Sequence, residues 1–253
     1  MSKSICAHQI SEINVGNPVK YIGTILLYCF WCAFVSAQQL NEAIEPLIEG
    51  DNVISLSQDN TLDNWQVPSN LWSIKNGIII GDTKGEKLDA SQWLYTKQSF
   101  KDFEFTCELK LSGDERRNTG IYYRVKTFLF TNARGTKSYM APSGYEFDAA
   151  FYQDNGINNK RNDRGALADW YARRSLRILA DQSLINKVFK TDQWNRMTIR
   201  ALANRLEYWI NGIKVMNYVD HDPQASREGL IGFQLHNGSA MKVEFRYIAV
   251  QRL

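Results

Sequence analysis

The chain has 253 residues, of which 44% are hydrophobic and 23% are charged, and its formal net charge is only +3. These proportions are typical of a folded globular protein and argue against a disordered chain. The small net charge argues against nucleic-acid binding, which usually needs a concentrated basic face. We therefore expect one sizeable folded domain together with a targeting segment.

The N-terminal segment has the pattern of a secretory signal peptide. An apolar stretch at 22–35 follows Lys20, and Val35 and Ala37 stand at the −3 and −1 positions of a cleavage site. The stretch is shorter than the roughly 20 apolar residues of a membrane span. We expect cleavage after Ala37 and export to a periplasm or out of the cell, without a stable membrane span; an uncleaved anchor is the alternative. The expected organisation is a signal peptide at 1–37, a spacer at 38–50 and one domain at 51–253.

Strand signals dominate the rest of the chain. Asn76-Gly77 and Asn211-Gly212 predict two hairpins, because Asn-Gly accepts positive φ at both central positions of a type I′ turn. Apolar residues alternate with polar ones across 103–111, which places Cys107 in the core rather than in a catalytic role. No long segment has a helical period, so the pattern predicts an all-β sandwich or barrel. The other expected strands are 71–75, 78–81, 121–125, 145–152, 197–203, 206–210, 213–218, 230–236 and 243–250.

Two long polar stretches, at 126–143 and 153–175, interrupt the strands. Loops of this length in a compact domain usually bind something, although solvated insertions are the alternative. The second stretch contains Trp170 and Tyr171 among several arginines. Aromatic rings contact the C–H faces of sugars, and guanidinium groups donate to sugar hydroxyls. Trp170 and Tyr171 are therefore candidate sugar-binding residues.

Three expected strands each present two polar side chains on the face opposite their apolar residues, because alternate residues of a strand share a face. The pairs are Tyr122 with Arg124, Glu146 with Asp148, and Gln234 with His236. A concave sheet face would bring these pairs together, whereas each pair alone is also explained by solvent exposure. Residues two apart on a strand are separated by about 6.5–7 Å, which leaves the stereochemistry of any glycosidase reaction open.

Nine short motifs follow one another along the chain. They are NW (64–65), WSIKNG (72–77), FEF (103–105), NTGIYYR (118–124), GYEFD (144–148), QWN (193–195), WING (209–212), GFQLH (232–236) and FRYI (245–248). In this order they resemble the 3-keto-disaccharide hydrolase family over residues 52–252, although single motifs also occur in concanavalin-like lectins. The family usually has Gln where this chain has Asp148. The substrate or metal preference of this chain therefore need not match that of the family's better-known members.

The resemblance implies a concanavalin A-like or LamG-like jelly roll of two antiparallel sheets, acting on glycosides oxidised at C3. The C3 ketone acidifies the C2–H bond, so a base can remove this proton and the C1 substituent can leave by β-elimination. Water then adds to the resulting 2-hydroxy-glucal, which completes a net hydrolysis.

This chemistry suggests a role for each polar pair. We expect Glu146 or His236 to act as the base, and Asp148 or His236 to donate a proton to the leaving group. Arg124, or a bound divalent cation, would polarise the ketone oxygen. The residues expected to orient sugar hydroxyls are Asn118, Tyr122 and Gln234.

Three other functions remain open from the sequence. A non-catalytic, lectin-like carbohydrate-binding module would depend on Trp170 and Tyr171 more than on Glu146. An ordinary glycosidase would use Glu146 and Asp148 on unoxidised sugars, but Ala150 stands where the related glucanases place a third acidic residue. An adhesion or interaction domain would use the strands only as a scaffold, since a fold does not fix a function.

Overall fold

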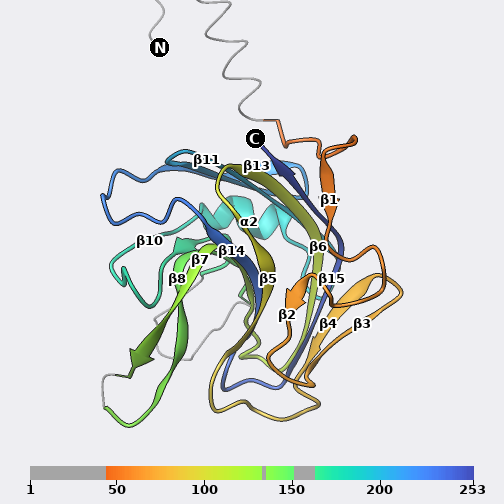
Figure 1. Cartoon of the computed structure of the whole chain (residues 1–253), viewed down its shortest axis with the longest axis vertical. Coiled ribbons are helices and arrows are strands. Elements are labelled where there is room, and N and C mark those ends of the chain that lie inside the picture. Colours follow the sequence, from red (N-terminus) through yellow and green to blue (C-terminus); the bar gives the residue numbers. More distant parts are fainter. Residues whose placement is uncertain (1–43, 133–134, 151–162) are drawn as a thin grey trace, which may run out of the picture. The chain divides into compact units, whose positions relative to one another are not determined.

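The computed structural model describes residues 44–132, 135–150 and 163–253, which form an all-β domain of two antiparallel sheets (Figure 1). The predicted two-sheet architecture is therefore confirmed. The predicted signal peptide at 1–37 and residues 38–43 of the predicted spacer lie outside the described residues. Within the described part, no helix combines the length and the apolar character that a membrane span requires.

One sheet has eight strands in the order β13-β12-β11-β6-β15-β4-β3, with β1 also paired to β15. Its strands are β1 (Val53–Ser55), β3 (Trp72–Lys75), β4 (Ile78–Asp82), β6 (Phe103–Gly113), β11 (Asn195–Leu202), β12 (Arg205–Ile210), β13 (Ile213–Val219) and β15 (Met241–Arg252). The two predicted Asn-Gly hairpins connect β3 to β4 and β12 to β13. Both turns have positive φ at each central residue, at 53° and 71° in the first and 51° and 90° in the second.

The other sheet has seven strands in the order β10-β9-β8-β7-β14-β5-β2. Its strands are β2 (Trp65–Gln66), β5 (Gln92–Phe100), β7 (Gly120–Thr131), β8 (Ser138–Asp148), β9 (Leu167–Ala168), β10 (Arg177–Ile178) and β14 (Gly229–Leu235). The helix α2 (Gln182–Val188) lies between β10 and β11 in the chain.

Aromatic side chains from both sheets build the core between them. Phe233 of β14 stacks on Phe245 of β15 with ring centroids 3.7 Å apart, and the hydroxyls of Tyr123 and Tyr208 are 2.7 Å apart across the same interface. Buried aromatic residues of this size contribute strongly to a sandwich core. Cys107 is 1% exposed within the core, as the sequence predicted.

The segment 126–143 differs from its predicted loop. Here β7 and β8 continue as a long hairpin with Phe128 opposite Ala141 and Phe130 opposite Tyr139, and this hairpin projects from the body of the sheet (Figure 1). The polar residues among these aromatics hid the strand pattern. The strand predicted at 145–152 ends at Asp148, and the part of the second predicted loop at 153–162 lies outside the described residues.

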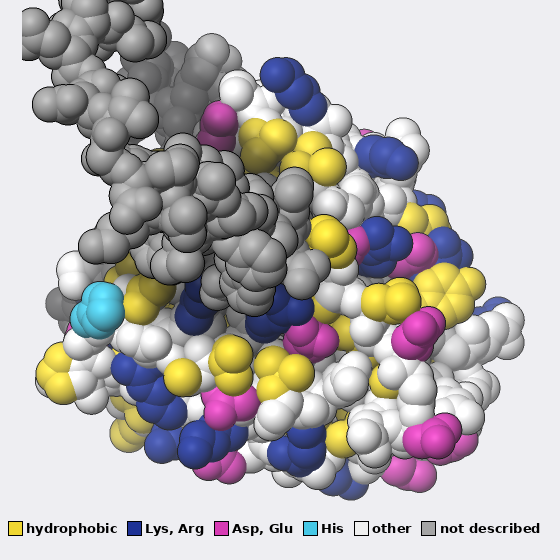
Figure 2. Space-filling view, turned by 90° about the horizontal axis from the view of Figure 1, so that it is seen from above, with side chains coloured by type: hydrophobic (Ala, Val, Ile, Leu, Met, Phe, Trp, Pro, Cys, Tyr) yellow, Lys and Arg dark blue, Asp and Glu magenta, His cyan; other side chains and the backbone are white. Residues whose placement is uncertain are grey.

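The surface charges are mixed rather than segregated. On the face shown in Figure 2, Lys and Arg side chains are interspersed with Asp and Glu. Ion pairs also cross the strands of the eight-stranded sheet, and the carboxylates of two of them are buried: Arg200 with Glu104 at 2.7 Å and Lys214 with Glu207 at 2.5 Å.

Candidate active site

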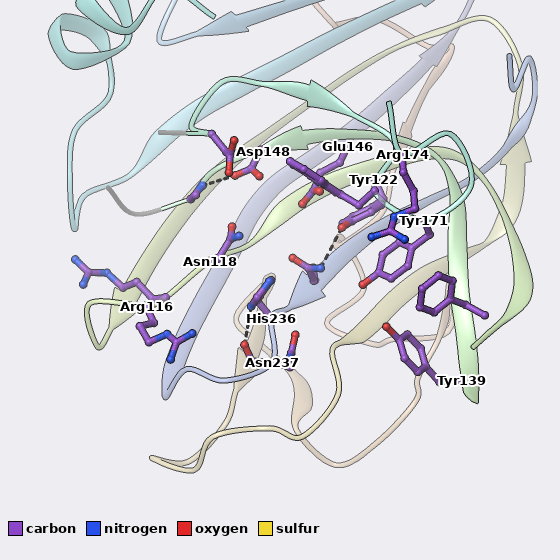
Figure 3. Close-up of a pocket in the computed structure, with 16 residues that line it drawn as sticks. Arg116, Asn118, Tyr122, Tyr139, Glu146, Asp148, Tyr171, Arg174, His236 and Asn237 are labelled. Atoms are coloured by element: carbon purple, nitrogen blue, oxygen red, sulfur yellow. Dashed lines mark hydrogen bonds between the residues drawn. The ribbon is translucent and has the colours of Figure 1, made fainter. Parts of the chain in front are cut away.

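A cavity of about 430 Å³ lies on the face of the seven-stranded sheet that points away from the core, which we call the cavity face (Figure 3). Its volume falls within the roughly 300–1,000 Å³ of small-molecule sites. Eight of the nine residues predicted from the sequence line it. They are Asn118, Tyr122, Glu146, Asp148, Trp170, Tyr171, Gln234 and His236. Their catalytic and binding roles remain predictions.

Strand pairing explains why these residues meet. Tyr122 of β7 stands opposite Glu146 of β8 and opposite Gly232 of β14. The three neighbouring strands therefore present their alternate residues on one face, as the period of two requires. Their other residues, such as Ile121 and Phe147, point into the core.

Glu146 is buried among neutral hydrogen-bond donors. Its side chain is 2% exposed, and it accepts hydrogen bonds from the Tyr122 hydroxyl and the Trp170 indole. Gln234 Nε2 in turn donates to the Tyr122 hydroxyl at 3.0 Å. Burial raises the pKa of Glu146 to about 8, because the charged form loses its hydration, and the two hydrogen bonds only partly oppose this shift. Glu146 is therefore mostly protonated at pH 7.

Gly120 makes room for the Glu146 carboxyl group. A Cβ atom at Gly120 would lie 2.1 Å from Glu146 Oε1, so no other residue fits beside this carboxyl in its present position. Sequence reasoning missed Gly120 as a site residue. A signal was present, because a glycine inside a strand often marks a close approach of another group.

After residues 151–162, which lie outside the described part, the chain returns along β8 as the short strand β9, and β10 forms the edge of the sheet beside it. Ala168 of β9 pairs with Glu146, and Trp170 follows two residues later, where its indole reaches Glu146. Arg173 fixes this segment by donating to Asp220 Oδ2 at 2.8 Å. Some arginines of the predicted sugar-binding loop thus hold the loop in place instead of facing a ligand, while Arg161 lies outside the described residues.

His236 has one ring nitrogen engaged and one free to accept a proton. Its Nδ1 lies 2.6 Å from the backbone oxygen of Asn237. Because a carbonyl oxygen can only accept, Nδ1 carries the hydrogen, and Nε2 of the neutral ring has a lone pair. Burial lowers the pKa of His236; the hydrogen bond to the Asn237 oxygen partly opposes this shift, and the positive charge of Arg116 lowers the pKa further. His236 is therefore neutral at pH 7.

Asp148 is held firmly at the end of β8. It is 1% exposed, and its Oδ1 accepts from the Ala150 N–H at 2.7 Å. Arg164 interacts electrostatically with Asp148 and donates from Nε to the Ala150 oxygen at 2.8 Å. Backbone and cation together fix the position of this carboxyl group.

The prediction that Arg124 faces the cavity beside Tyr122 is wrong. The ladder between β7 and β8 has a register shift between Tyr123 and Lys126, and Arg124 has a φ of 51°. Such a β-bulge breaks the alternation of faces and re-aims the side chain. The guanidinium is fully buried and donates to the Lys101 oxygen at 2.8 Å, the Ala203 oxygen at 2.8 Å and Asp102 Oδ1 at 3.0 Å.

Other cavity residues escaped the sequence analysis. Phe130 and Tyr139 reach the cavity from the extended hairpin, and Arg116 and Arg174 line it as cations. Within the described residues, neither of these two guanidinium groups makes a hydrogen bond. The alternation of Phe128 and Phe130 was the available signal for the hairpin. No comparable signal marked the two arginines, because both stand in irregular segments.

Unpaired polar atoms indicate where a ligand would bind. Among the described residues, Asn118 Oδ1 and Gln234 Oε1 are buried without a hydrogen-bond partner. Buried acceptors are normally paired, so each would gain from a ligand hydroxyl. No cluster of three or more His, Cys, Asp or Glu side chains suited to a metal ion occurs in the described part of the chain. A divalent cation stays a prediction.

Comparison with solved structures places this fold among galectin-like and concanavalin-like jelly rolls. A candidate glycosyl hydrolase from Parabacteroides distasonis matches with a TM-score of 0.57 and 17% identity, over 83% of this chain and 99% of that one. A Bacillus subtilis protein of unknown function with a galectin-like fold gives 0.55 and 14%, over 82% and 97%. The exoplasmic/lumenal domain of VIP36, in a Ca²⁺/Man3GlcNAc-bound form, gives 0.55 and 10%, over 82% and 91%. At these identities the similarity concerns the fold alone.

The family follows from the sequence match. The family model of the 3-keto-alpha-glucoside-1,2-lyase-like domain matches residues 52–251, and the chain belongs to this family. The resemblance predicted from the nine motifs is thus confirmed. A comparison with curated proteins finds no significant match.

Proposed function

We propose that this chain is an exported enzyme that cleaves 3-keto-glycosides by proton abstraction at C2, β-elimination and hydration. Membership of the 3-keto-alpha-glucoside-1,2-lyase-like family supports the substrate class. The observation that carries the mechanism is a pair of opposite pKa shifts in one cavity. The pKa of Glu146 is raised and that of His236 is lowered, and such pairs divide acid and base roles.

His236 acts as the base, because it is neutral at pH 7 and Nε2 has a free lone pair. It takes the C2 proton, and the electron pair moves into the C2–C3 bond while the ketone becomes an enolate. The enolate then re-forms the ketone, the C1–C2 double bond forms and the C1–O bond breaks. Glu146 donates its proton to the departing oxygen. The sequence predicted Asp148 or His236 as this donor and Glu146 as a possible base. In the present proposal Glu146 takes the donor role, and Asp148 holds the wall of the cavity beside Arg164.

Hydration runs through the same two groups in reverse. The Glu146 carboxylate takes a proton from water as its oxygen bonds to C1, and protonated His236 returns a proton to C2. Both residues thereby recover their starting states, and the sum of the two steps is hydrolysis. Glu146 suits both directions, because a group with a pKa near 8 gains and loses protons readily around neutral pH.

The remaining roles follow from uncommitted polar groups. Since Arg124 is engaged inside the fold, the positive charge at the ketone oxygen comes from Arg116 or Arg174, which line the cavity. Asn118 and Gln234 accept hydrogen bonds from sugar hydroxyls through their unpaired oxygens, while Tyr122 and Trp170 orient Glu146.

The test is turnover by the purified chain on 3-keto-glycosides and their unoxidised parents, with and without EDTA, followed by mass spectrometry. We expect products from the oxidised compounds only. Cleavage of the parents would instead favour an ordinary glycosidase, and sensitivity to EDTA would assign the ketone-side charge to a metal. Export is tested separately, by sequencing the N-terminus of protein recovered outside the cytoplasm, where a start at Gln38 is expected.

The pH dependence of kcat/KM should be bell-shaped. As the pH falls through the lowered pKa of His236, the base becomes protonated and the rate drops. As the pH rises through about 8, Glu146 loses the proton that the leaving group needs and the rate drops again. A rate that rises through pH 8 to a plateau would make Glu146 the base and reverse the assignment.

A second candidate is a non-catalytic carbohydrate-binding module of the same fold. The unpaired acceptors Asn118 Oδ1 and Gln234 Oε1, next to aromatic rings, favour it because sugar binding needs nothing more. Calorimetry with the same compounds separates the two functions. Affinity without any product, retained in a Glu146→Gln variant, would identify a binding module.

A further inference from the structure

The cavity has two ends of different chemistry. One end carries the polar residues Asn118, Asp148 and His236, and the other carries the rings of Tyr139 and Tyr171 (Figure 3). Phe130 belongs to the aromatic end, because its ring centroid is 5.3 Å from that of Tyr171. The cavity volume of about 430 Å³ exceeds that of a single pyranose ring, so a sugar at the polar end leaves room for its C1 substituent.

The rings of the aromatic end hold one another in place. Phe130 and Tyr139 each meet Tyr171 nearly at right angles, at 81° and 88° between ring planes. The centroids of Phe130 and Tyr139 are 5.6 Å apart, and Trp93 packs behind Tyr171 at 5.8 Å. Edge-to-face contacts of this kind are favourable and fix ring orientation. The result is a rigid apolar wall.

The surface of the aromatic end separates it further from the polar end. Asn118 Oδ1, at the polar end, is buried without a hydrogen-bond partner among the described residues. At the aromatic end, Phe130, Tyr139 and Tyr171 line the cavity with rings that pack on one another, although Trp93 Nε1 behind them is also unpaired in the described part of the chain. A second sugar would have to bury hydroxyls against the carbon atoms of these rings, which is costly. A planar apolar group meets no such cost.

The hairpin of β7 and β8 is built to supply this wall. Phe130 and Tyr139 stand opposite each other on its cavity face, and Leu129 and Met140 stand opposite each other on its other face. Leu129 and Met140 are 68% and 54% exposed. The two pairs are neighbours in sequence, yet only the aromatic pair lines the cavity.

We propose that the aromatic end is the leaving-group subsite and that it selects 3-keto-glycosides of aromatic alcohols. This inference rests on the proposed function, because it assigns the sugar to the polar end and the C1 substituent to the wall formed by Phe130, Tyr139 and Tyr171. The ring of the leaving group packs on this wall, and its glycosidic oxygen lies at the boundary between the two ends, toward Glu146.

The test compares kcat/KM for a 2-naphthyl and a methyl 3-keto-glucoside in the wild type and in Phe130→Ala, Tyr139→Ala and Leu129→Ala. We expect each aromatic variant to lower the naphthyl-to-methyl ratio about tenfold, chiefly through KM, because the lost contact is made only by the naphthyl ring. Leu129→Ala, on the opposite face of the same hairpin, should leave the ratio unchanged. An unchanged ratio in both aromatic variants would overturn the inference.

Two further measurements keep the result decisive if a variant folds poorly. In the wild type, free 2-naphthol should inhibit turnover of the methyl glycoside competitively, and absence of inhibition would overturn the inference. A 3-keto-disaccharide preferred over the naphthyl glycoside would also overturn it and place a second sugar in the subsite. If the wild type and both aromatic variants turn over the methyl and naphthyl glycosides with the same ratio of kcat/KM, this inference alone is wrong. If the wild type turns over neither glycoside, the proposed function is wrong as well.

Discussion

Glu146 on β8 and Glu207 on β12 are equally buried, each 2% exposed, but their surroundings are opposite. Glu207 lies 2.5 Å from Lys214 Nζ and 3.5 Å from Arg205 Nε, so its charge is compensated. Glu146 meets the neutral donors Tyr122 and Trp170 and takes up a proton instead. A buried ionisable group with compensated charge supports structure, whereas one with a strongly shifted pKa in a cavity is a candidate for chemistry.

The same difference extends to the two sheets. The outer face of the eight-stranded sheet pairs its carboxylates across strands, as in Glu104 with Arg200 and Glu108 with Arg246. The cavity face of the seven-stranded sheet contains the unpaired oxygens of Asn118 and Gln234. The outer face of the eight-stranded sheet thus pairs these carboxylates with cations, whereas the cavity face has buried acceptors without a partner among the described residues.

The largest expected effect is on turnover. Glu146→Gln keeps the size of the side chain but removes the transferable proton, so kcat should fall by roughly 10²–10⁴-fold, the usual contribution of a general acid or base. Glu207→Gln should keep kcat, measured well below its melting temperature. Steady-state kinetics on one 3-keto-glycoside compares the two variants directly.

The contrast between a catalytic Glu146 and a structural Glu207 is wrong if the two variants have the same kcat. Equal loss of activity would mean that turnover depends on the general stability of the sandwich. Full activity in Glu146→Gln would remove Glu146 from the mechanism.

The sequence predicted which residues line the site better than it predicted which groups each of them contacts. Alternation predicted that Glu146 and Asp148 share one face of their strand and that Gln234 and His236 share one face of theirs. Both predictions hold, because these stretches are regular β-strands. Alternation failed at Arg124, where a bulge reverses the face. A bulge depends on how two strands pair, and one strand read alone contains no such information.

The partners of each residue also escaped prediction. Glu207 and Glu146 both stand among apolar residues in strands, and nothing local distinguishes them. The cations near Glu207 and the neutral donors near Glu146 come from neighbouring strands and from the segment after β9. The shift in the pKa of Glu146 is thus a property of strand register. Register is set by the whole sheet and not by one motif.

The effect of Glu146→Gln on the free energy of unfolding should depend on pH, and this dependence should distinguish Glu146 from Glu207. Because the pKa of Glu146 is raised from 4.5 to about 8 on folding, the unfolded chain loses this proton at a lower pH than the folded chain does. The contribution of Glu146 to stability is thus fully present below pH 4.5 and is lost as the pH rises to about 8. Glu146→Gln avoids the loss, so its stability relative to wild type should increase over this range by at most about 5 kcal/mol.

Urea unfolding at pH 5, 7 and 9 measures this difference. Glu207→Gln serves as the control and should be less stable than wild type at pH 7, because it leaves Lys214 and Arg205 without their anion. A constant difference between Glu146→Gln and wild type from pH 5 to pH 9 would show that Glu146 titrates normally and would remove the basis for its role as the acid.

The smallest expected effect comes from Gly120, which acts only by positioning Glu146. In Gly120→Ala the new Cβ would overlap Glu146 Oε1, and the flexible carboxyl group can move away while the backbone stays in place. We expect kcat to fall about tenfold with little change in KM or melting temperature, since a small displacement of a catalytic group is enough for such a loss. Pushed toward solvent, Glu146 should ionise more easily, so the alkaline limb of the pH profile should move to lower pH. A purely structural role for Gly120 would lower the melting temperature and leave that limb where it is. The alanine variant therefore tests whether the burial of Glu146, rather than its mere presence, sets its chemistry.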